Sequence, residues 1–262
     1  MLNADYTAGF FSGIHQGSED SAREMVPWLV DLLRPTSVVD VGCGLGIWLK
    51  VLHENGVGKI LGLDAPWVPV DKLKIPAEKF VQADLAHLDT VAVDSFGRFD
   101  LALSLEVAEH IPAEHAKAFV AMLTDLAPCV LFSAAIPDQG GIGHVNERWP
   151  QDWMSTFREF NYVCIDCVRG RFWDDDKVAP WYAQNAFFFV EEQAANRYEL
   201  LREAEAKYSF GRRSVIHPKQ YARKIAELRD PNTWSIREVI RVAPSRFKQA
   251  FKHRLFGAPV ED

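Results

Sequence analysis

The sequence predicts an α/β fold, built on a doubly wound, mostly parallel sheet of seven strands and followed by a helical C-terminal extension. Three observations predict this fold. Short apolar runs alternate with amphipathic, helix-like segments from residue 21 to residue 191. The first of these runs is β-branched and ends in glycines, which is typical of a buried parallel strand. Beyond Gln193 the pattern becomes helical and basic, so the sheet is expected to end there.

The first four elements are each bounded by a clear signal. Apolar residues at helical spacing run over Ser21–Arg34, and Pro35 ends this predicted helix. The first predicted strand is Ser37–Val41. A second helix, Ile47–Glu54, closes at an Asn-Gly pair, and a second strand follows at Lys59–Asp64.

The remaining elements continue the alternation. Two more helices are expected, at Ala113–Leu126 and at Pro150–Phe160, where proline takes the first helical position. Five more strands are expected, at Lys79–Asp84, Phe99–Leu105, Cys129–Ile136, Tyr162–Val168 and Ala186–Glu191.

Length and composition predict one catalytic domain over residues 1–193 and an extension over residues 194–262. The chain has 262 residues, 48% of them hydrophobic, which suffices for one sizeable domain. No apolar run reaches the roughly 18 residues that cross a bilayer, and no secretory leader is recognisable. The one C-x-x-C pair, Cys164 and Cys167, lacks the second pair of a zinc ribbon. We therefore expect buried free thiols and a cytoplasmic location.

The net charge of −7 conceals an asymmetry between the two parts of the chain. Acidic residues outnumber basic ones before residue 196, which makes the body a poor partner for nucleic acid. The C-terminal part is basic, with helices expected at Tyr198–Lys207, His217–Arg229 and Ser235–Leu255. The last of these is amphipathic. It could contact an anionic membrane surface, or pack on the domain or on a second subunit as in a homodimer.

The main functional signal is the segment Asp-Val-Gly-Cys-Gly-Leu-Gly, which joins the first strand to the next helix. Glycines there let the backbone turn tightly and approach a ligand closely. The spacing is G-x-G-x-G at Gly42, Gly44 and Gly46, whereas a dinucleotide-binding G-x-G-x-x-G would need a small residue in place of Ile47. Asp40 disfavours a pyrophosphate but suits the ammonium group of a methionine moiety.

Two further carboxylates follow the next two strands. Asp64 ends the second strand, where an acidic residue can accept hydrogen bonds from ribose hydroxyls. Asp84 follows the third strand, where it can accept a hydrogen bond from the amino group of adenine. Together with Asp40 they indicate a nucleoside attached to a cationic group.

The motifs VVDVGCGLG, GLDAP, VQADL and FDLALSLEVAEHIP cover residues 38–112 and resemble those of class I S-adenosylmethionine-dependent methyltransferases. The resemblance implies a Rossmann-like fold with S-adenosyl-L-methionine as cofactor. It also implies a set of cofactor-binding residues. These are Asp40, Gly42, Gly44 and Gly46 at the methionine end, Asp64 at the ribose, Asp84 and Leu85 at the adenine, and Leu105 and Glu106 beside the transferred methyl group.

Two motifs of other methyltransferase classes limit the possible methyl acceptors. The fourth strand is followed by no Asn/Asp-Pro-Pro-Tyr/Phe motif of base-amine methylases. The Pro-Cys dipeptide that carries the nucleophile of cytosine-C5 methylases occurs only as Pro128-Cys129, at the start of the apolar fifth strand, where we expect a buried free thiol. A small-molecule or glycan acceptor remains, most readily a hydroxyl oxygen. Two alternatives stay open: an NAD-dependent oxidoreductase, and a non-catalytic protein that binds S-adenosylmethionine.

A hydroxyl acceptor needs a base or a metal ion near it. His144 lies in a glycine-rich segment after the fifth strand and is the first candidate for a general base, because histidine exchanges protons near neutral pH. Glu109 and His110, after the fourth strand, are the second candidates. A divalent metal on Asp138, His144 and Glu147 is an alternative without a diagnostic spacing, so no metal site is assigned.

The segment GGIGHVNERWPQDW and the later WYAQN also resemble methyltransferases of polysaccharide and glycosylated natural-product pathways. This resemblance implies a sugar hydroxyl as acceptor. Four aromatic residues could stack on a sugar or merely pack the fold: Trp149, Trp153, Trp181 and Tyr182. Three near the N-terminus could cover the cofactor or pack the domain: Tyr6, Phe10 and Phe11.

Overall fold

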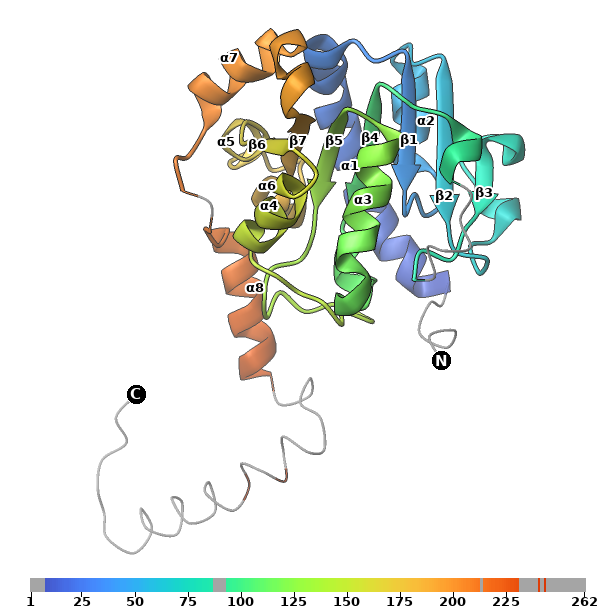
Figure 1. The fold of residues 1–262 in the computed structure, drawn as a ribbon. Coiled ribbons are helices and arrows are strands. Elements are labelled where there is room, and N and C mark those ends of the chain that lie inside the picture. The colour runs from blue at the N-terminus through green and yellow to red at the C-terminus, as the bar shows by residue number, and fades with distance from the viewer. Residues whose placement is uncertain (1–7, 87–92, 213, 231–239, 241–242, 244–262) are drawn as a thin grey trace, which may run out of the picture. The chain divides into compact units, whose positions relative to one another are not determined.

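The computed structural model describes residues 8–86, 93–212, 214–230, 240 and 243 (Figure 1). The chain divides into two compact units, residues 1–217 and residues 218–262. The first unit contains the whole sheet and every predicted site residue. No helix in the described ranges is both long enough and apolar enough to cross a membrane.

The first unit is built on one seven-stranded sheet in the order β3-β2-β1-β4-β5-β7-β6 (Figure 1). Strands β1 to β5 run parallel, whereas β7 runs antiparallel to both β5 and β6. This confirms the predicted sheet. The strand bounds are β1 Ser37–Val41, β2 Lys59–Asp64, β3 Phe80–Gln82, β4 Leu101–Leu105, β5 Cys129–Ser133, β6 Tyr162–Ile165 and β7 Phe187–Glu191.

Three strands end earlier than predicted, because their neighbours end. β3 stops at Gln82, which pairs with Asp64, the last residue of β2. β5 stops at Ser133, which pairs with Leu105, the last residue of β4. β6 stops at Ile165, which pairs with Phe188 near the start of β7. The apolar residues beyond β6 form a short helix instead, α5 (Val168–Phe172).

Helices cover both faces of the sheet (Figure 1). Alternate strand residues face opposite cores, so Val38 of β1 packs in the cluster with α1 and α2, while Val39 packs in the cluster with α3 and α4. The helix bounds are α1 Ala8–Leu33, α2 Ile47–Glu54, α3 Ala116–Leu126, α4 Pro150–Arg158, α6 Pro180–Asn185 and α7 Glu199–Tyr208.

The N-terminal helix and the end of the compact unit differ from expectation. α1 begins at Ala8 rather than at residue 21, in a stretch whose glycines obscure any helical pattern. After the sheet, α7 buries Leu201 and Ala204 in the same core as α1 and α2, so the compact unit continues beyond residue 193. The functional boundary placed there stays a prediction.

The second unit is described mainly by one helix, α8 (Pro218–Arg229), which matches the predicted helix over residues 217–229. The expected amphipathic helix over residues 235–255 lies almost wholly outside the described residues. So does Tyr6, and the side chains of Phe10 and Phe11 are not described.

Candidate active site

The glycine turn after β1 has the left-handed backbone that only glycine adopts easily. The φ angles are 87° at Gly42, 55° at Gly44 and 79° at Gly46. The backbone N–H of Gly42 donates to the carbonyl of Leu63 in β2 at 2.7 Å, which fixes the turn at the carboxyl ends of β1 and β2. α2 begins immediately after it, at Ile47.

Side-chain space differs sharply among the three glycines. A Cβ at Gly42 would overlap the methyl groups of Val107. A Cβ at Gly46 would lie only 2.9 Å from the side chain of Ile75. A Cβ at Gly44 would meet nothing within 4 Å. The outer surface of the turn at Gly44 is therefore open to a ligand, while its two ends are packed against the protein.

Two carboxylates lie beside this turn. Asp40 is 2% exposed, and its burial, together with the nearby Asp64, raises the pKa of the Asp40 carboxyl to about 8. Burial also raises the pKa of Asp64, although its Oδ2 accepts a hydrogen bond from Gly44 N at 2.6 Å and its Oδ1 accepts one from Ala65 N at 2.6 Å. The structure thus brings Asp40, Gly44 and Asp64 together, and a cationic ligand group would favour the ionised form of the two carboxyl groups.

Asp84 and Leu85 continue this edge beyond β3. The backbone of Ala83 donates to the carbonyl of Asp64 at 2.7 Å, which ties the start of the segment to the end of β2. Asp84 accepts a hydrogen bond from Ala86 N at 3.0 Å, and Leu85 is buried. The predicted adenine residues therefore lie along the same edge of the sheet as the predicted ribose residue.

Glu106 takes a left-handed conformation, with φ 57°, directly after β4. Such a conformation is uncommon for a residue other than glycine and often marks a functional site. The Glu106 carboxylate accepts hydrogen bonds from Gln139 Nε2 at 2.9 Å and from Asn185 Nδ2 at 3.2 Å. It is therefore held between the loop after β5 and the end of α6.

These two amides were not predicted as site residues, and neither was their neighbour Gln184. Asn185 Nδ2 donates to Gln139 Oε1 at 2.9 Å, and Gln184 Nε2 donates to the Asn185 amide oxygen at 2.9 Å. Gln184 and Asn185 belong to the segment WYAQN, whose sequence predicted no helix. Without α6, nothing in the sequence indicated that both amides turn inward.

The loop after β5 is organised around the carboxylate of Glu147. It accepts backbone hydrogen bonds from Asp138 at 2.8 Å and from Gly140 at 2.9 Å, and His144 Nδ1 donates to its Oε1 at 2.8 Å. The His144 ring lies so close over Gly141 that a Cβ there would overlap it. The orientation of His144 is thus fixed from both sides, with Nδ1 engaged and Nε2 the remaining ring nitrogen.

Glu109 and His110 lie next to His144, on the 3₁₀ helix η5 (Ala108–His110). The two imidazole rings meet edge to face with their centroids 4.8 Å apart. Backbone hydrogen bonds from Val145 and Asn146 to the Glu109 carbonyl hold the loop against η5. The structure therefore joins the two sets of candidate catalytic residues that the sequence placed in separate segments.

Burial changes the protonation of both residues of η5. Glu109 is 1% exposed, and burial, followed by repulsion from Glu106, raises the pKa of its carboxyl well above the usual value. Burial, followed by His144, lowers the pKa of His110 to about 4. Among the described residues, the one cluster of three metal-type ligands is Glu109, His110 and His144, so the suggested set with Asp138 and Glu147 is not the one that forms.

The aromatic residues expected near an acceptor divide into two groups. Trp153 is 2% exposed and packs against Phe132, and Tyr182 is buried with its hydroxyl 3.0 Å from Ser18 Oγ. These two pack the fold and cannot stack on a sugar. Trp181 is partly buried and packs against Tyr182, whereas Trp149, directly before α4, is 38% exposed. Trp149 therefore stays a candidate.

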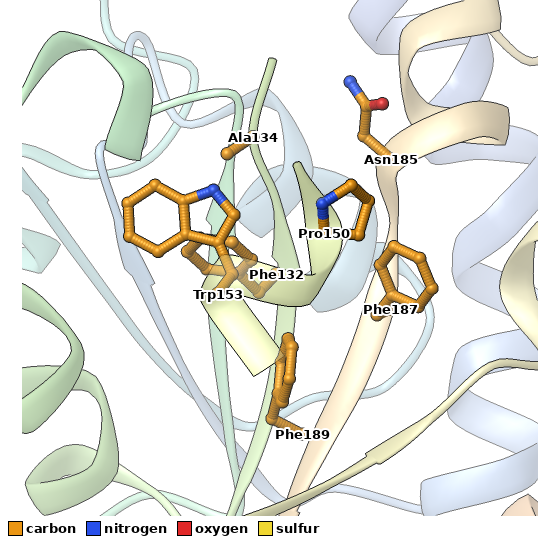
Figure 2. A pocket seen from close by; sticks show the side chains of 7 residues that line it. All are labelled: Phe132, Ala134, Pro150, Trp153, Asn185, Phe187 and Phe189. Atoms are coloured by element: carbon orange, nitrogen blue, oxygen red, sulfur yellow. The ribbon is translucent and has the colours of Figure 1, made fainter. Parts of the chain in front are cut away.

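A small cavity lies beneath this region, lined mainly by apolar side chains (Figure 2). Its volume is about 10 Å³, room for about one water molecule, so it holds neither cofactor nor sugar. Asn185 lines one end of it, next to the amide network, and Phe189 lies at the other (Figure 2). The cavity is a packing feature under the site.

Comparison with known proteins agrees with this geometry. Residues 17–173, more than half of the chain, match the family described as a methyltransferase domain. A ribosomal RNA large subunit methyltransferase E of Desulfatibacillum aliphaticivorans is 38% identical over 77 residues, which cover 28% of this chain and 36% of that protein. A ubiquinone biosynthesis O-methyltransferase of Rhodopseudomonas palustris (strain BisA53) is 26% identical over 183 residues, 67% of each protein.

Among solved structures, magnesium protoporphyrin IX methyltransferase from Synechocystis PCC 6803 with bound SAM shares the fold. Its TM-score is 0.50 at 20% sequence identity, over 72% of this chain and 88% of that one. The family match removes the oxidoreductase alternative, in line with the buried Ile47 at the position where a dinucleotide site needs a small residue. The chain therefore belongs to the methyltransferase-domain family, the S-adenosylmethionine-dependent methyltransferases.

Proposed function

We propose that this protein transfers a methyl group from S-adenosylmethionine to a hydroxyl oxygen of a sugar or glycan, with His144 as the general base. The observation that carries the proposal is the pair of His144 and Glu147, in which the carboxylate holds Nδ1 at 2.8 Å. A base whose second nitrogen is oriented by a carboxylate is an arrangement suited to removing a proton from a hydroxyl.

The residues along the edge of the sheet are suited to hold the methyl donor. The open surface at Gly44 admits the methionine end, where Asp40 faces the ammonium group, while Asp64 and Asp84 accept hydrogen bonds from the nucleoside. Leu85 and Leu105 supply apolar contacts. When bound, the sulfonium supplies an electrophilic methyl group.

Oxygen as the acceptor atom has two supports. The Rhodopseudomonas palustris relative is named as an O-methyltransferase. In addition, a hydroxyl needs help to lose its proton, and His144 and its carboxylate partner provide that help. The exposed Trp149, five residues after His144, offers an aromatic face for a sugar ring.

A direct test is a screen of nucleotide sugars and glycans, together with phenols and amines, for formation of S-adenosylhomocysteine. We expect turnover with a sugar-containing acceptor and loss of it in His144→Ala. Turnover restricted to amines or phenols would refute the sugar acceptor. Calorimetric binding of S-adenosylmethionine with no turnover on any acceptor class would favour the non-catalytic alternative.

A further inference from the structure

Three metal-type ligands from two distant segments meet at the carboxyl edge of the sheet. Glu109 and His110 follow β4, and His144 belongs to the loop after β5. One potential ligand atom of each residue lies within 4.8 Å of the others. Imidazole and carboxylate together are ligands that favour divalent transition metals.

Both histidines are oriented as metal ligands usually are. A metal-binding histidine generally donates its other ring N–H to a carboxylate or to a backbone carbonyl, which fixes the tautomer. His144 Nδ1 pairs with the Glu147 carboxylate at 2.8 Å, and His110 Nδ1 pairs with the Gly143 carbonyl at 3.3 Å. Each ring thus keeps Nε2 for an ion.

The third ligand, Glu109, has a buried carboxyl oxygen without a hydrogen-bond partner in the described part of the chain. Glu109 is 1% exposed, and its Oε2 has no hydrogen-bond partner among the described residues. A buried polar atom without a partner is costly, and two more carboxylates, those of Glu106 and Glu147, add negative charge around it. A cation between Glu109 and the two imidazoles would provide a partner for this oxygen and would compensate the negative charge around it.

We propose that Glu109, His110 and His144 bind one divalent transition-metal ion, of the Zn²⁺, Fe²⁺ or Mn²⁺ type. Two histidines and one carboxylate leave coordination positions open for water or substrate oxygens. Ligands at about 2.1 Å from one ion are at most about 4.2 Å apart, so the side chains close in slightly on binding. Glu147 is then the partner that positions His144, not a ligand.

The chemical consequence rests on the proposed methyl transfer to a hydroxyl. An acceptor hydroxyl bound at an open position loses its proton to solvent more readily, because the ion stabilises the alkoxide. Its oxygen then forms the new bond to the methyl carbon, while the carbon–sulfur bond breaks and its electron pair stays on sulfur. With His144 Nε2 on the ion, the metal takes over the task of the base.

The test measures metal binding without any substrate. The full-length protein is freed of metal with EDTA, dialysed and titrated with Zn²⁺ by calorimetry, and Co²⁺ is added separately to record its visible spectrum. The variants are Glu109→Gln, His110→Ala and His144→Ala. His115→Ala, an exposed histidine five residues after His110, is the matched control. Circular dichroism confirms that each variant is folded.

We expect one ion per chain in the wild-type protein and in His115→Ala, with Co²⁺ bands of a site containing nitrogen ligands. The three cluster variants should bind at least about 100-fold more weakly, since even partners of ligands contribute 10–100-fold. Zn²⁺ binding that is absent from the wild type, or is equal in folded cluster variants, would overturn the proposal. If the protein binds the metal but methylates no hydroxyl, the metal site stands and the proposed function is refuted. If it methylates hydroxyls in EDTA and binds no metal, the function stands and the metal site is refuted.

Discussion

His144 and Glu147 form a fixed pair, in which the imidazole Nδ1 donates to the carboxylate Oε1 at 2.8 Å. The same carboxylate accepts backbone hydrogen bonds from Asp138 and Gly140. One side chain therefore shapes the loop after β5 and sets the direction of the imidazole. Changing the pair should affect catalysis more than cofactor binding, for which we propose the turn after β1.

We expect His144→Ala to lower turnover at least about 100-fold and Glu147→Gln to lower it about 10-fold. The first variant removes the imidazole, which acts either as the base or as a ligand of the metal ion, and the second removes only the carboxylate that orients it. Calorimetry with S-adenosylmethionine should give nearly unchanged affinity in both variants. His115→Ala is the control for a surface histidine. If His144→Ala retained full activity, the role of His144 would be wrong.

The glycine turn provides a second prediction, because Gly42 and Gly44 differ in the space available for a side chain. Gly42 and Gly44 both have positive φ, but only a Cβ at Gly42 would overlap Val107. Gly42→Ala should therefore lower the melting temperature by several degrees more than Gly44→Ala, since the overlap adds about 1–3 kcal/mol to the strain that both share. Adding Val107→Ala to Gly42→Ala should recover part of the loss. Equal effects of the two single variants would contradict the steric argument.

The sequence was informative where local pattern decides structure. The turn from Asp40 to Gly46 was predicted because its glycines, its strand and its helix are contiguous. The helix over Ser21–Arg34 was predicted, but its extension back to Ala8 was not, because the glycines in that stretch obscure the helical pattern. The burial of Trp153 and Tyr182 was equally invisible, because either reading of these aromatics fitted the sequence.

In the candidate site, the sequence likewise predicted the individual residues but not the contacts between them. Glu109, His110 and His144 were each singled out as candidates, but their meeting depends on the loop after β5 folding back onto η5. Hydrogen bonds from Val145 and Asn146 to the Glu109 carbonyl make that contact. Such a pairing between residues far apart in the chain cannot be deduced from one sequence.

The nucleoside carboxylates provide a third prediction. Asp64→Asn should weaken binding of S-adenosylmethionine at least about 10-fold and Asp84→Asn should weaken it similarly, in line with the loss of hydrogen bonds to a charged group. Asp125→Asn, an exposed aspartate on α3, is the matched control and should leave the affinity unchanged. Calorimetric titration of the three variants measures the differences. Unchanged affinity in Asp64→Asn would remove the ribose role assigned to it.

The buried Asp40 provides a pH prediction whose sign follows from its raised pKa of about 8, against 3.8 for an ordinary aspartate. Between these two values the folded protein holds a proton that the unfolded chain has lost, so this group's contribution to stability falls as pH rises from about 4 to 8. Asp40→Asn keeps the shape but does not titrate. The melting temperature of the variant, relative to the wild type, should therefore be higher at pH 8 than at pH 5, in the absence of ligand.

Binding of the methyl donor should reverse this advantage. Near the ammonium group, Asp40 is stable as a carboxylate, so S-adenosylmethionine should raise the melting temperature of the wild type more than that of Asp40→Asn, most clearly at pH 8. Below pH 8 the wild type must release a proton when it binds S-adenosylmethionine, whereas Asp40→Asn should release less. Calorimetry in buffers of different ionisation enthalpy measures this proton release. A pH-independent difference between the two proteins, or equal proton release, would show that Asp40 does not titrate in this range and does not face the ammonium group.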